Sequence, residues 1–165
     1  MQTLNSMALE IERKYLVRGD FKPFAVKEDR IVQGYLSSVP ERSVRIRLSG
    51  GRGYLTIKGP GNSSGVSRFE WEREISPGEA EELLTLCEPG VIEKIRYLVP
   101  AGSLHFEVDE FLGDNAGLII AEIELTREDE SFEKPFWLGT EVTGQPEYYN
   151  ASLMRKPFRS WASTT

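Results

Sequence analysis

The chain has 165 residues, a formal net charge of −6 and a single cysteine, Cys87. Its length is that of one domain, and its acidic balance argues against nucleic-acid binding, which relies on a basic excess. One cysteine excludes an intramolecular disulfide and fits a reducing cytoplasm, and no apolar run approaches the roughly 20 residues that span a bilayer. We therefore expect a cytoplasmic protein without nucleic-acid or membrane partners.

Residues 1–8 have neither the basic start nor the apolar centre of a signal peptide. We interpret them as an N-terminal extension, either disordered or derived from a tag. No linker or internal repeat divides the remainder, so residues 9–165 are predicted to form a single domain.

Apolar and polar side chains then alternate along most of the chain, which is the period of a β-strand. The alternating runs cover residues 9–14, 31–36, 44–48, 55–58, 68–74, 94–97, 106–109 and 121–125. Glycine- and proline-containing turns separate several of them, at residues 49–51, 59–61, 100–102 and 113–115. About eight short strands at this spacing predict an antiparallel sheet that is closed or nearly closed.

Helices are predicted to be few. Ser76, Pro77 and Glu79 have the spacing of a capping box with proline at the first helical position, so a helix starts there and ends before Pro89. Two further short helices are expected over residues 126–132 and 147–154.

Charged residues gather on one face of these strands, and the opposite face is mostly apolar. Two arrangements fit this pattern: an open sheet whose charged face meets water, or a barrel with a charged interior. Like-sign pairs two residues apart, such as Glu10 with Glu12 and Arg45 with Arg47, favour the barrel, because paired acids repel unless a cation offsets the repulsion. Hard divalent cations prefer carboxylate oxygens, and phosphoryl transfer needs both a metal and basic groups. The predicted fold class is α+β, an eight-stranded antiparallel barrel with a charged interior and a few covering helices.

At these residues the chain resembles the CYTH, or triphosphate tunnel metalloenzyme, family, and in particular its short bacterial single-domain members. Glu10-Ile11-Glu12-Arg13-Lys14 matches the family's ExExK motif. The other family segments follow in order: Val44-Arg45-Ile46-Arg47, Thr56-Ile57-Lys58-Gly59, Arg68-Phe69-Glu70-Trp71-Glu72, Glu93-Lys94-Ile95-Arg96, Phe106-Glu107-Val108-Asp109 and Ala121-Glu122-Ile123-Glu124.

The resemblance implies a role for each matching residue. Phosphate contacts are expected from Lys14, Arg45, Arg47, Lys58, Lys94 and Arg96. Metal ligands are expected from Glu10, Glu12, Asp109, Glu122 and Glu124. Catalytic roles fall to Glu10, Glu12, Lys94 and Tyr35, with Glu70, Glu72 and Lys156 in support.

Two of these residues have alternatives that the sequence leaves open. Tyr35 either faces Lys94 and influences proton transfer or only fills the barrel. At the C-terminal end, Arg155 competes with Lys156 for the supporting role. His105, the one histidine, is expected on the surface or in packing.

The implied activity is Mg²⁺-dependent hydrolysis of inorganic tripolyphosphate by water attack on a terminal phosphoryl group, with Mn²⁺ as an alternative ion. Three other functions stay open: an adenylate cyclase, a thiamine triphosphatase, and a noncatalytic module that binds polyphosphate or nucleotides. The expected partner is a small-molecule triphosphate, and formation of a homodimer is left open.

Overall fold

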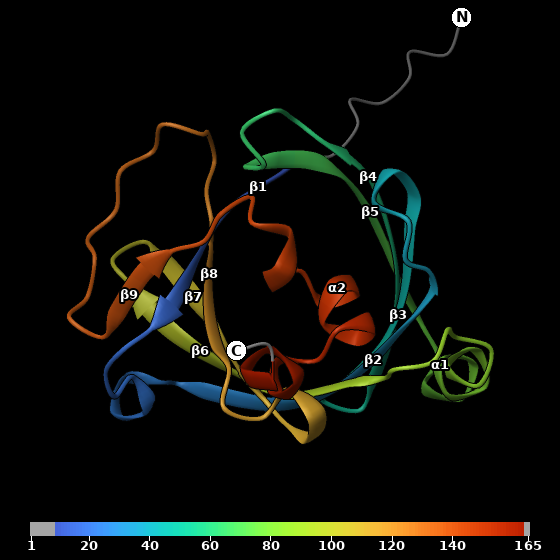
Figure 1. Ribbon diagram of the computed structural model, residues 1–165. Coiled ribbons are helices and arrows are strands. Elements are labelled where there is room, and N and C mark those ends of the chain that lie inside the picture. The colour runs from blue at the N-terminus through green and yellow to red at the C-terminus, as the bar shows by residue number, and fades with distance from the viewer. Residues whose placement is uncertain (1–8, 164–165) are drawn as a thin grey trace, which may run out of the picture.

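In the computed structural model, which describes residues 9–163, eight antiparallel strands close into a barrel (Figure 1). The strands are β1 (Leu9–Val17), β2 (Lys27–Ser37), β3 (Ser43–Ser49), β4 (Arg52–Gly61), β5 (Ser67–Ile75), β6 (Ile92–Ala101), β7 (Leu104–Phe111) and β8 (Ile119–Glu124). Their order around the ring is β5-β4-β3-β2-β6-β7-β8-β1, and pairing of β1 with β5 closes it. The predicted eight-stranded antiparallel barrel is confirmed.

β1 has three partners. One of its edges pairs with β8, where Lys14 lies opposite Glu122. The other edge pairs first with β5, where Glu10 lies opposite Arg68, and then with β9 (Leu138–Glu141). The sequence did not predict β9, which lies outside the closed ring and extends the sheet at β1.

Two glycines form the tight turn between β3 and β4. β3 and β4 are joined by Gly50 and Gly51, whose φ angles are 56° and 77°. A two-residue turn with positive φ at both positions matches the twist of the strands that it joins. The turn expected at residues 59–61 lies slightly later, because β4 continues through Gly61 and the Asn62 amide donates to the carbonyl of Ser67 at 2.8 Å.

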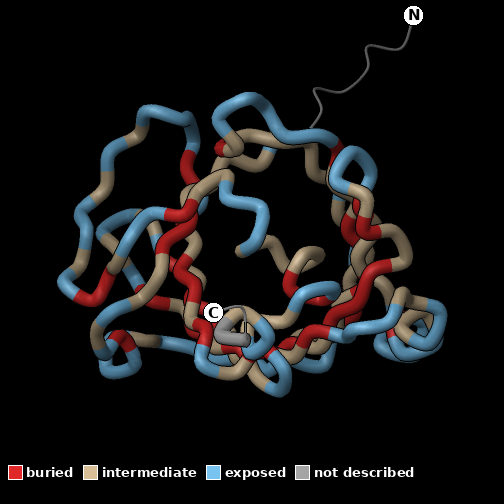
Figure 2. Tube along the Cα trace, in the orientation of Figure 1, coloured by how far each residue is buried: buried red, intermediate tan, exposed pale blue. Residues whose placement is uncertain are grey.

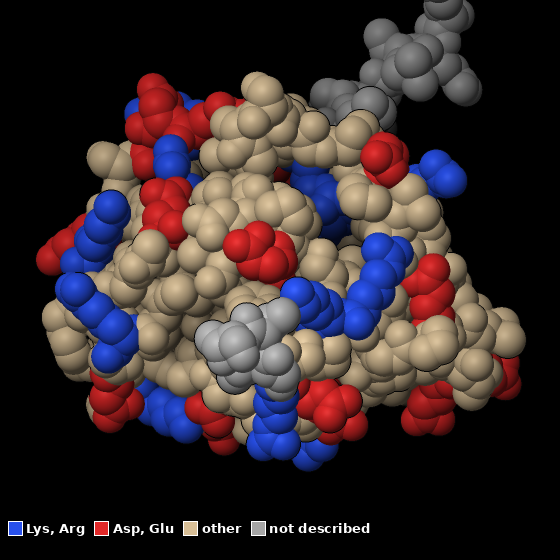
Figure 3. Space-filling model, in the orientation of Figure 1, with Lys and Arg blue, Asp and Glu red and all other residues tan. Residues whose placement is uncertain are grey.

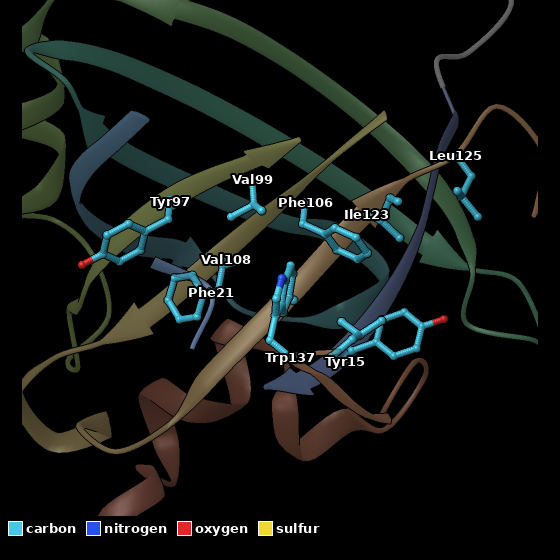
Figure 4. Close-up of a cluster of buried hydrophobic side chains, with 11 residues drawn as sticks. Tyr15, Phe21, Tyr97, Val99, Phe106, Val108, Ile123, Leu125 and Trp137 are labelled. Atoms are coloured by element: carbon cyan, nitrogen blue, oxygen red, sulfur yellow. The ribbon is translucent and has the colours of Figure 1, made fainter. Parts of the chain in front are cut away.

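The main apolar core lies outside the barrel. Phe106 and Val108 of β7 point away from the interior and are fully buried against Trp137, which precedes β9 (Figure 4). The Trp137 ring makes an edge-on contact with Phe106 at a centroid separation of 5.1 Å and a tilted contact with Phe21 at 6.0 Å. The segment around β9 therefore shields the apolar outer face of β1, β6, β7 and β8.

The helix α1 (Pro77–Leu84) packs on the outer face of β2, β3 and β4. Its predicted capping box is present: the Ser76 hydroxyl accepts from the Glu79 amide, and the Glu79 carboxylate accepts from the Ser76 amide. Ala80 of this helix is fully buried above Gly53, where a Cβ atom would lie 2.8 Å from that of Ala80. Glycine at 53 thus allows α1 to approach the sheet.

The helix α2 (Asn150–Arg155) lies within the ring of strands (Figure 1). Its Leu153 and Met154 join a second buried cluster with Phe111, Leu118 and Ile120, which fills one end of the barrel. The helix is shorter than the predicted 147–154, because a 3-10 turn at Pro146–Tyr148 precedes it and Tyr149 has an extended backbone.

The helix expected over residues 126–132 is absent, so that prediction was wrong. Both the amide and the hydroxyl of Thr126 donate to the Glu130 carboxylate, at 2.6 and 2.8 Å, and close a turn instead. Phe132 then packs edge-on against Tyr15 of the outer core.

Burial alternates along part of the sheet only. In β6, buried Ile92 and Lys94 flank the half-exposed Glu93, whereas β5 contains no buried residue. Figure 2 shows how buried, half-exposed and exposed stretches are distributed along the chain. Within residues 9–163 no helix combines the length and apolar character needed to cross a bilayer. The predicted extension at residues 1–8 lies outside the described residues.

Replacing Trp137 tests the importance of the outer core. Trp137→Ala removes a side chain that is 2% exposed, and loss of a buried aromatic typically costs about 3–5 kcal/mol. We expect the free energy of unfolding in urea to fall by that amount. Leu86→Ala is the control, since Leu86 is 72% exposed. Equal stability of the two variants would contradict this account of the core.

Candidate active site

The barrel interior contains one channel with two lobes of opposite charge. The acidic lobe has a volume of about 180 Å³ and is lined by seven carboxylates and four basic side chains. The basic lobe has a volume of about 330 Å³ and is lined by seven basic side chains and two carboxylates. The lobes meet at Glu12, Arg45, Lys58, Arg96 and Glu122, which line both. Lys and Arg side chains are visible inside the hollow on the face shown in Figure 3.

Strand alternation positions these groups along the channel. On β1, Glu10 lines the acidic lobe, Glu12 lies at the junction and Lys14 lines the basic lobe. Arg47 of β3, Glu70 and Glu72 of β5 and Glu124 of β8 line the acidic lobe. Of the expected phosphate contacts, all six line the channel, and they come from β1, β3, β4 and β6.

Most basic side chains of the channel are held by carboxylates. Lys14 lies 3.3 Å from Glu122, and Lys58 lies 2.5 Å from Glu10 and 3.3 Å from Glu70. Arg45 and Arg47 share Glu72 at 3.6 and 3.5 Å. These pairs keep the charged groups in fixed positions around the channel, since a buried charge without a partner is costly.

Some donors have no acceptor. The Nε atoms of Arg45 and Arg47 are buried and have no hydrogen-bond partner among the described residues. Among the described residues, Arg68 donates only to the carbonyls of Gly59 and Pro40, and the Arg155 guanidinium group donates to the Ser38 hydroxyl. Buried donors of native proteins are normally satisfied, so an anion with several oxygens is the ligand that this part of the channel fits.

The carboxylates repel one another where they converge. Glu12 lies opposite Glu124 in the β1–β8 register. Burial, followed by repulsion from Glu122 and Glu10, raises the pKa of Glu12 to about 8. Burial also raises the pKa of Glu10 despite the nearby Lys58. By contrast, although burial opposes ionisation, the charges of Lys14 and Arg96 hold the pKa of Glu122 well below its ordinary value.

This donor set fits a divalent metal by its chemistry. A hard cation prefers carboxylate oxygens, and its charge would relieve the repulsion that raises the pKa of Glu12. Among residues 9–163, no three carboxylate, imidazole or thiolate groups already form a metal-binding cluster. Glu10, Glu12, Glu122 and Glu124 are the predicted ligands that line the acidic lobe.

Asp109 was predicted as a metal ligand, and it pairs with two bases of the channel. Its Oδ2 accepts from Lys94 Nζ at 2.6 Å and from Arg96 at 2.8 Å, and its Oδ1 accepts from Arg96 Nε at 2.7 Å. It is 2% exposed and lines neither lobe. Both of its oxygens accept from cations, so Asp109 anchors Lys94 and Arg96, and its role as a metal ligand stays a prediction.

Lys94 is the most deeply buried base of the channel, with 1% of its surface exposed. Burial, reinforced by the charge of Arg96 and opposed by Asp109, lowers its pKa to about 8. Tyr35 lines the same basic lobe and is also buried in the apolar cluster with Phe111, so both alternatives for it stay open. A lysine with this pKa is still mostly charged at pH 7, but it releases its proton more readily than an ordinary lysine.

Two positions near the channel differ from the sequence analysis, and a third agrees with it. Lys156 lines neither lobe, whereas its alternative, Arg155, lines the basic one. His105 is exposed, as expected, and it shares the parity of Glu107 and also lines the acidic lobe. The amide oxygen of Asn150 lies 3.1 Å from Lys94 Nζ. The sequence analysis missed this contact, because an isolated Asn-Ala-Ser carries no signal for a contact with a distant strand.

Comparison with known proteins shows related sequences and a related fold. The CYTH domain family model matches residues 8–158. An inorganic triphosphatase of Acetivibrio thermocellus is 48% identical over 156 residues, which are 94% of this chain and 99% of that protein. An inorganic triphosphatase of Nitrosomonas europaea is 37% identical over 150 residues, 87% of this chain and 95% of that protein. The crystal structure of an inorganic triphosphatase matches with a TM-score of 0.62 and 32% identity, covering 88% of this chain and 97% of the other.

The raised pKa of Glu12 makes a prediction about stability. With its pKa raised from 4.5 to about 8, the folded protein keeps a proton that the unfolded chain releases. Stability is therefore lost as pH rises from about 4.5 to about 8. In EDTA, Glu12→Gln should match the native chain near pH 5 and unfold at a higher temperature at pH 8, by about 2–4 °C for each kcal/mol gained. A thermal midpoint below that of the native chain at pH 8 would contradict the assigned repulsion.

Proposed function

Since this chain belongs to the CYTH domain family, we propose that it is an inorganic triphosphatase that hydrolyses tripolyphosphate in its channel with bound Mg²⁺. One observation carries the proposal: carboxylates and bases line one channel inside the closed barrel, in an acidic lobe and a basic lobe. The relatives that are named inorganic triphosphatases support the substrate, because they match this chain over nearly their full length.

The bases bind and orient the substrate. The shared residues Arg45, Lys58 and Arg96 lie at the junction of the lobes, with Lys14 and Lys94 in the basic lobe. Their charges neutralise the triphosphate, and the unpaired Nε atoms of Arg45 and Arg47 are directed donors for its oxygens. Preorganised donors of this kind stabilise the charge that develops in phosphoryl transfer.

The acidic lobe holds the metal in this proposal. Glu12, Glu122 and Glu124 are the ligands, with Glu10 beside them. Bound Mg²⁺ would supply neutralisation of phosphoryl charge and activation of the nucleophile. Glu10 and Glu12 would orient a water molecule for attack on the terminal phosphorus, and no covalent nucleophile is needed. Lys94, whose pKa is lowered to about 8, and Tyr35 provide proton exchange at the basic end.

The experiment that tests the function measures both product classes. The chain is incubated with tripolyphosphate, ATP, thiamine triphosphate or pyrophosphate, each with Mg²⁺ or Mn²⁺, and phosphate and cyclic AMP are measured. We expect phosphate release to be fastest from tripolyphosphate with Mg²⁺ and to stop in EDTA. Faster formation of cyclic AMP from ATP would establish a cyclase, and binding without turnover would establish a noncatalytic module.

Glu124→Gln isolates the role of the metal ligands. Glu124 forms no ion pair with another described residue, so its neutralisation breaks no such contact. Loss of a metal ligand that stabilises phosphoryl charge by several kcal/mol should lower kcat by at least about 100-fold. Its thermal midpoint should stay close to that of the native chain. Turnover within twofold of the native value at saturating Mg²⁺ would remove Glu124 from the metal site.

Arg45→Gln tests substrate binding. A hydrogen bond to a charged group contributes about 1.5–3 kcal/mol, so kcat/KM for tripolyphosphate should fall about 10- to 100-fold. Arg52→Gln is the matched control, because Arg52 is exposed at the start of β4 and lines neither lobe. If both variants behaved alike, Arg45 would not contact the substrate.

A further inference from the structure

Lys94 has only a limited number of hydrogen-bond donors to give to a ligand. Its ammonium group carries three N–H donors. One goes to Asp109 Oδ2 at 2.6 Å, and a second goes to Asn150 Oδ1 at 3.1 Å. With two directions fixed by protein acceptors, the third N–H has one remaining direction available in the basic lobe, which Lys94 lines.

Asn150 comes from a distant part of the chain. It is the first residue of α2, and its Oδ1 also accepts from Gln33 Nε2 of β2 at 3.0 Å. Gln33 is fully buried on the inner face of the barrel. One amide oxygen therefore links α2 to two neighbouring strands, β2 and β6, which pair with each other.

The remainder of α2 is held independently of this link. Leu153 is fully buried and Met154 nearly so, both in the apolar cluster at the end of the barrel. The amide of Lys156 donates to the carbonyl of Ser152 at 2.8 Å and closes the last turn of the helix. These contacts hold α2 in place without the half-buried amide of Asn150.

We infer that Asn150 is a positioning residue that directs the Lys94 ammonium group toward a phosphate oxygen of the substrate. The inference rests on the proposed function, because it assigns a task within the same channel. Asn150 does not reach the acidic lobe, and it lines only the basic one. Its effect on the reaction passes through Lys94.

An amide suits this position better than a carboxylate. Asp109 already supplies one negative charge to Lys94 at 2.6 Å. A second carboxylate would add negative charge to the lobe that binds an anion, and like charges at close range repel. Asn150 offers the acceptor oxygen without the charge. The buried Gln33 likewise supplies a neutral donor to that oxygen.

The test compares variants at position 150 by steady-state kinetics on tripolyphosphate at saturating Mg²⁺. Asn150→Leu keeps the size and removes the acceptor, and kcat should fall about 10- to 100-fold, the typical cost of a misplaced catalytic group. Asn150→Asp restores an oxygen acceptor, so it should recover kcat relative to Asn150→Leu while raising KM through repulsion of the anion. A loss of folding alone does not predict this split between kcat and KM.

Gln145→Leu is the matched control, because it makes the same amide-to-aliphatic change in the same segment at an exposed residue. It should leave kcat, KM and the thermal midpoint unchanged. Gln33→Leu should lower kcat less than Asn150→Leu, and the double variant should be no worse than Asn150→Leu alone, because both changes break one network. Should Asn150→Leu fail to fold, the raised KM of Asn150→Asp and the lowered kcat of Gln33→Leu test the positioning role instead.

The outcomes separate the two proposals. Native kcat in folded Asn150→Leu, or equal losses in Asn150→Leu and Asn150→Asp without a change in KM, would overturn the positioning role and leave the triphosphatase intact. Absence of phosphate release from the native chain itself would reject the proposed function and the positioning role together.

Discussion

The structure depends on the placement of many charges in one channel inside the closed barrel. An isolated buried charge is unstable, so each base must meet a carboxylate or a ligand. Lys14, Lys58 and Lys94 meet Glu122, Glu10 and Asp109 respectively. The pairing is incomplete at both ends: carboxylates are in excess in one lobe and bases in the other. A triphosphate with a divalent cation has the matching distribution of charge, so under the proposed function the two would complete a network that the protein leaves unfinished.

A charged interior requires the apolar core to lie elsewhere. Outward-facing residues of β1, β6, β7 and β8 pack under the segment around Trp137, and α1 covers the outer face of β2, β3 and β4. A smaller apolar cluster around Leu153 fills one end of the barrel. Hydrophobic burial outside the ring thus stabilises a barrel whose inner surface is reserved for polar contacts.

Much of this could be predicted because strand alternation is strictly local. A period of two assigns Arg45 and Arg47 to one face and Ile46 to the other without knowledge of tertiary structure. The same rule predicted the placement of Glu10, Glu12 and Lys14, and applied consistently it also places His105 beside Glu107. The capping box at Ser76 could also be predicted from the sequence, since its two hydrogen bonds join residues three positions apart.

What escaped prediction depends on contacts between distant residues. Strand parity places Asp109 on the inner face. The β6–β7 register sets it opposite Arg96, and only this register shows that its oxygens accept hydrogen bonds from neighbouring bases. β9 has no alternating pattern of its own and exists because β1 offers a free edge beyond β5. Asn150 lies 56 residues from Lys94 and 117 from Gln33, so no spacing in the sequence connects them.

β1 joins the stability of the barrel to its chemistry. It is the strand at which the ring closes, and it also holds the last strand of the sheet. Its inward residues run from Glu10 in the acidic lobe through Glu12 at the junction to Lys14 in the basic lobe. A shift of one residue in its pairing would turn all three outward and bring Leu9, Ile11 and Arg13 into the channel. The register that closes the barrel is therefore the same register that sets the carboxylates and the base of this strand in line along the channel.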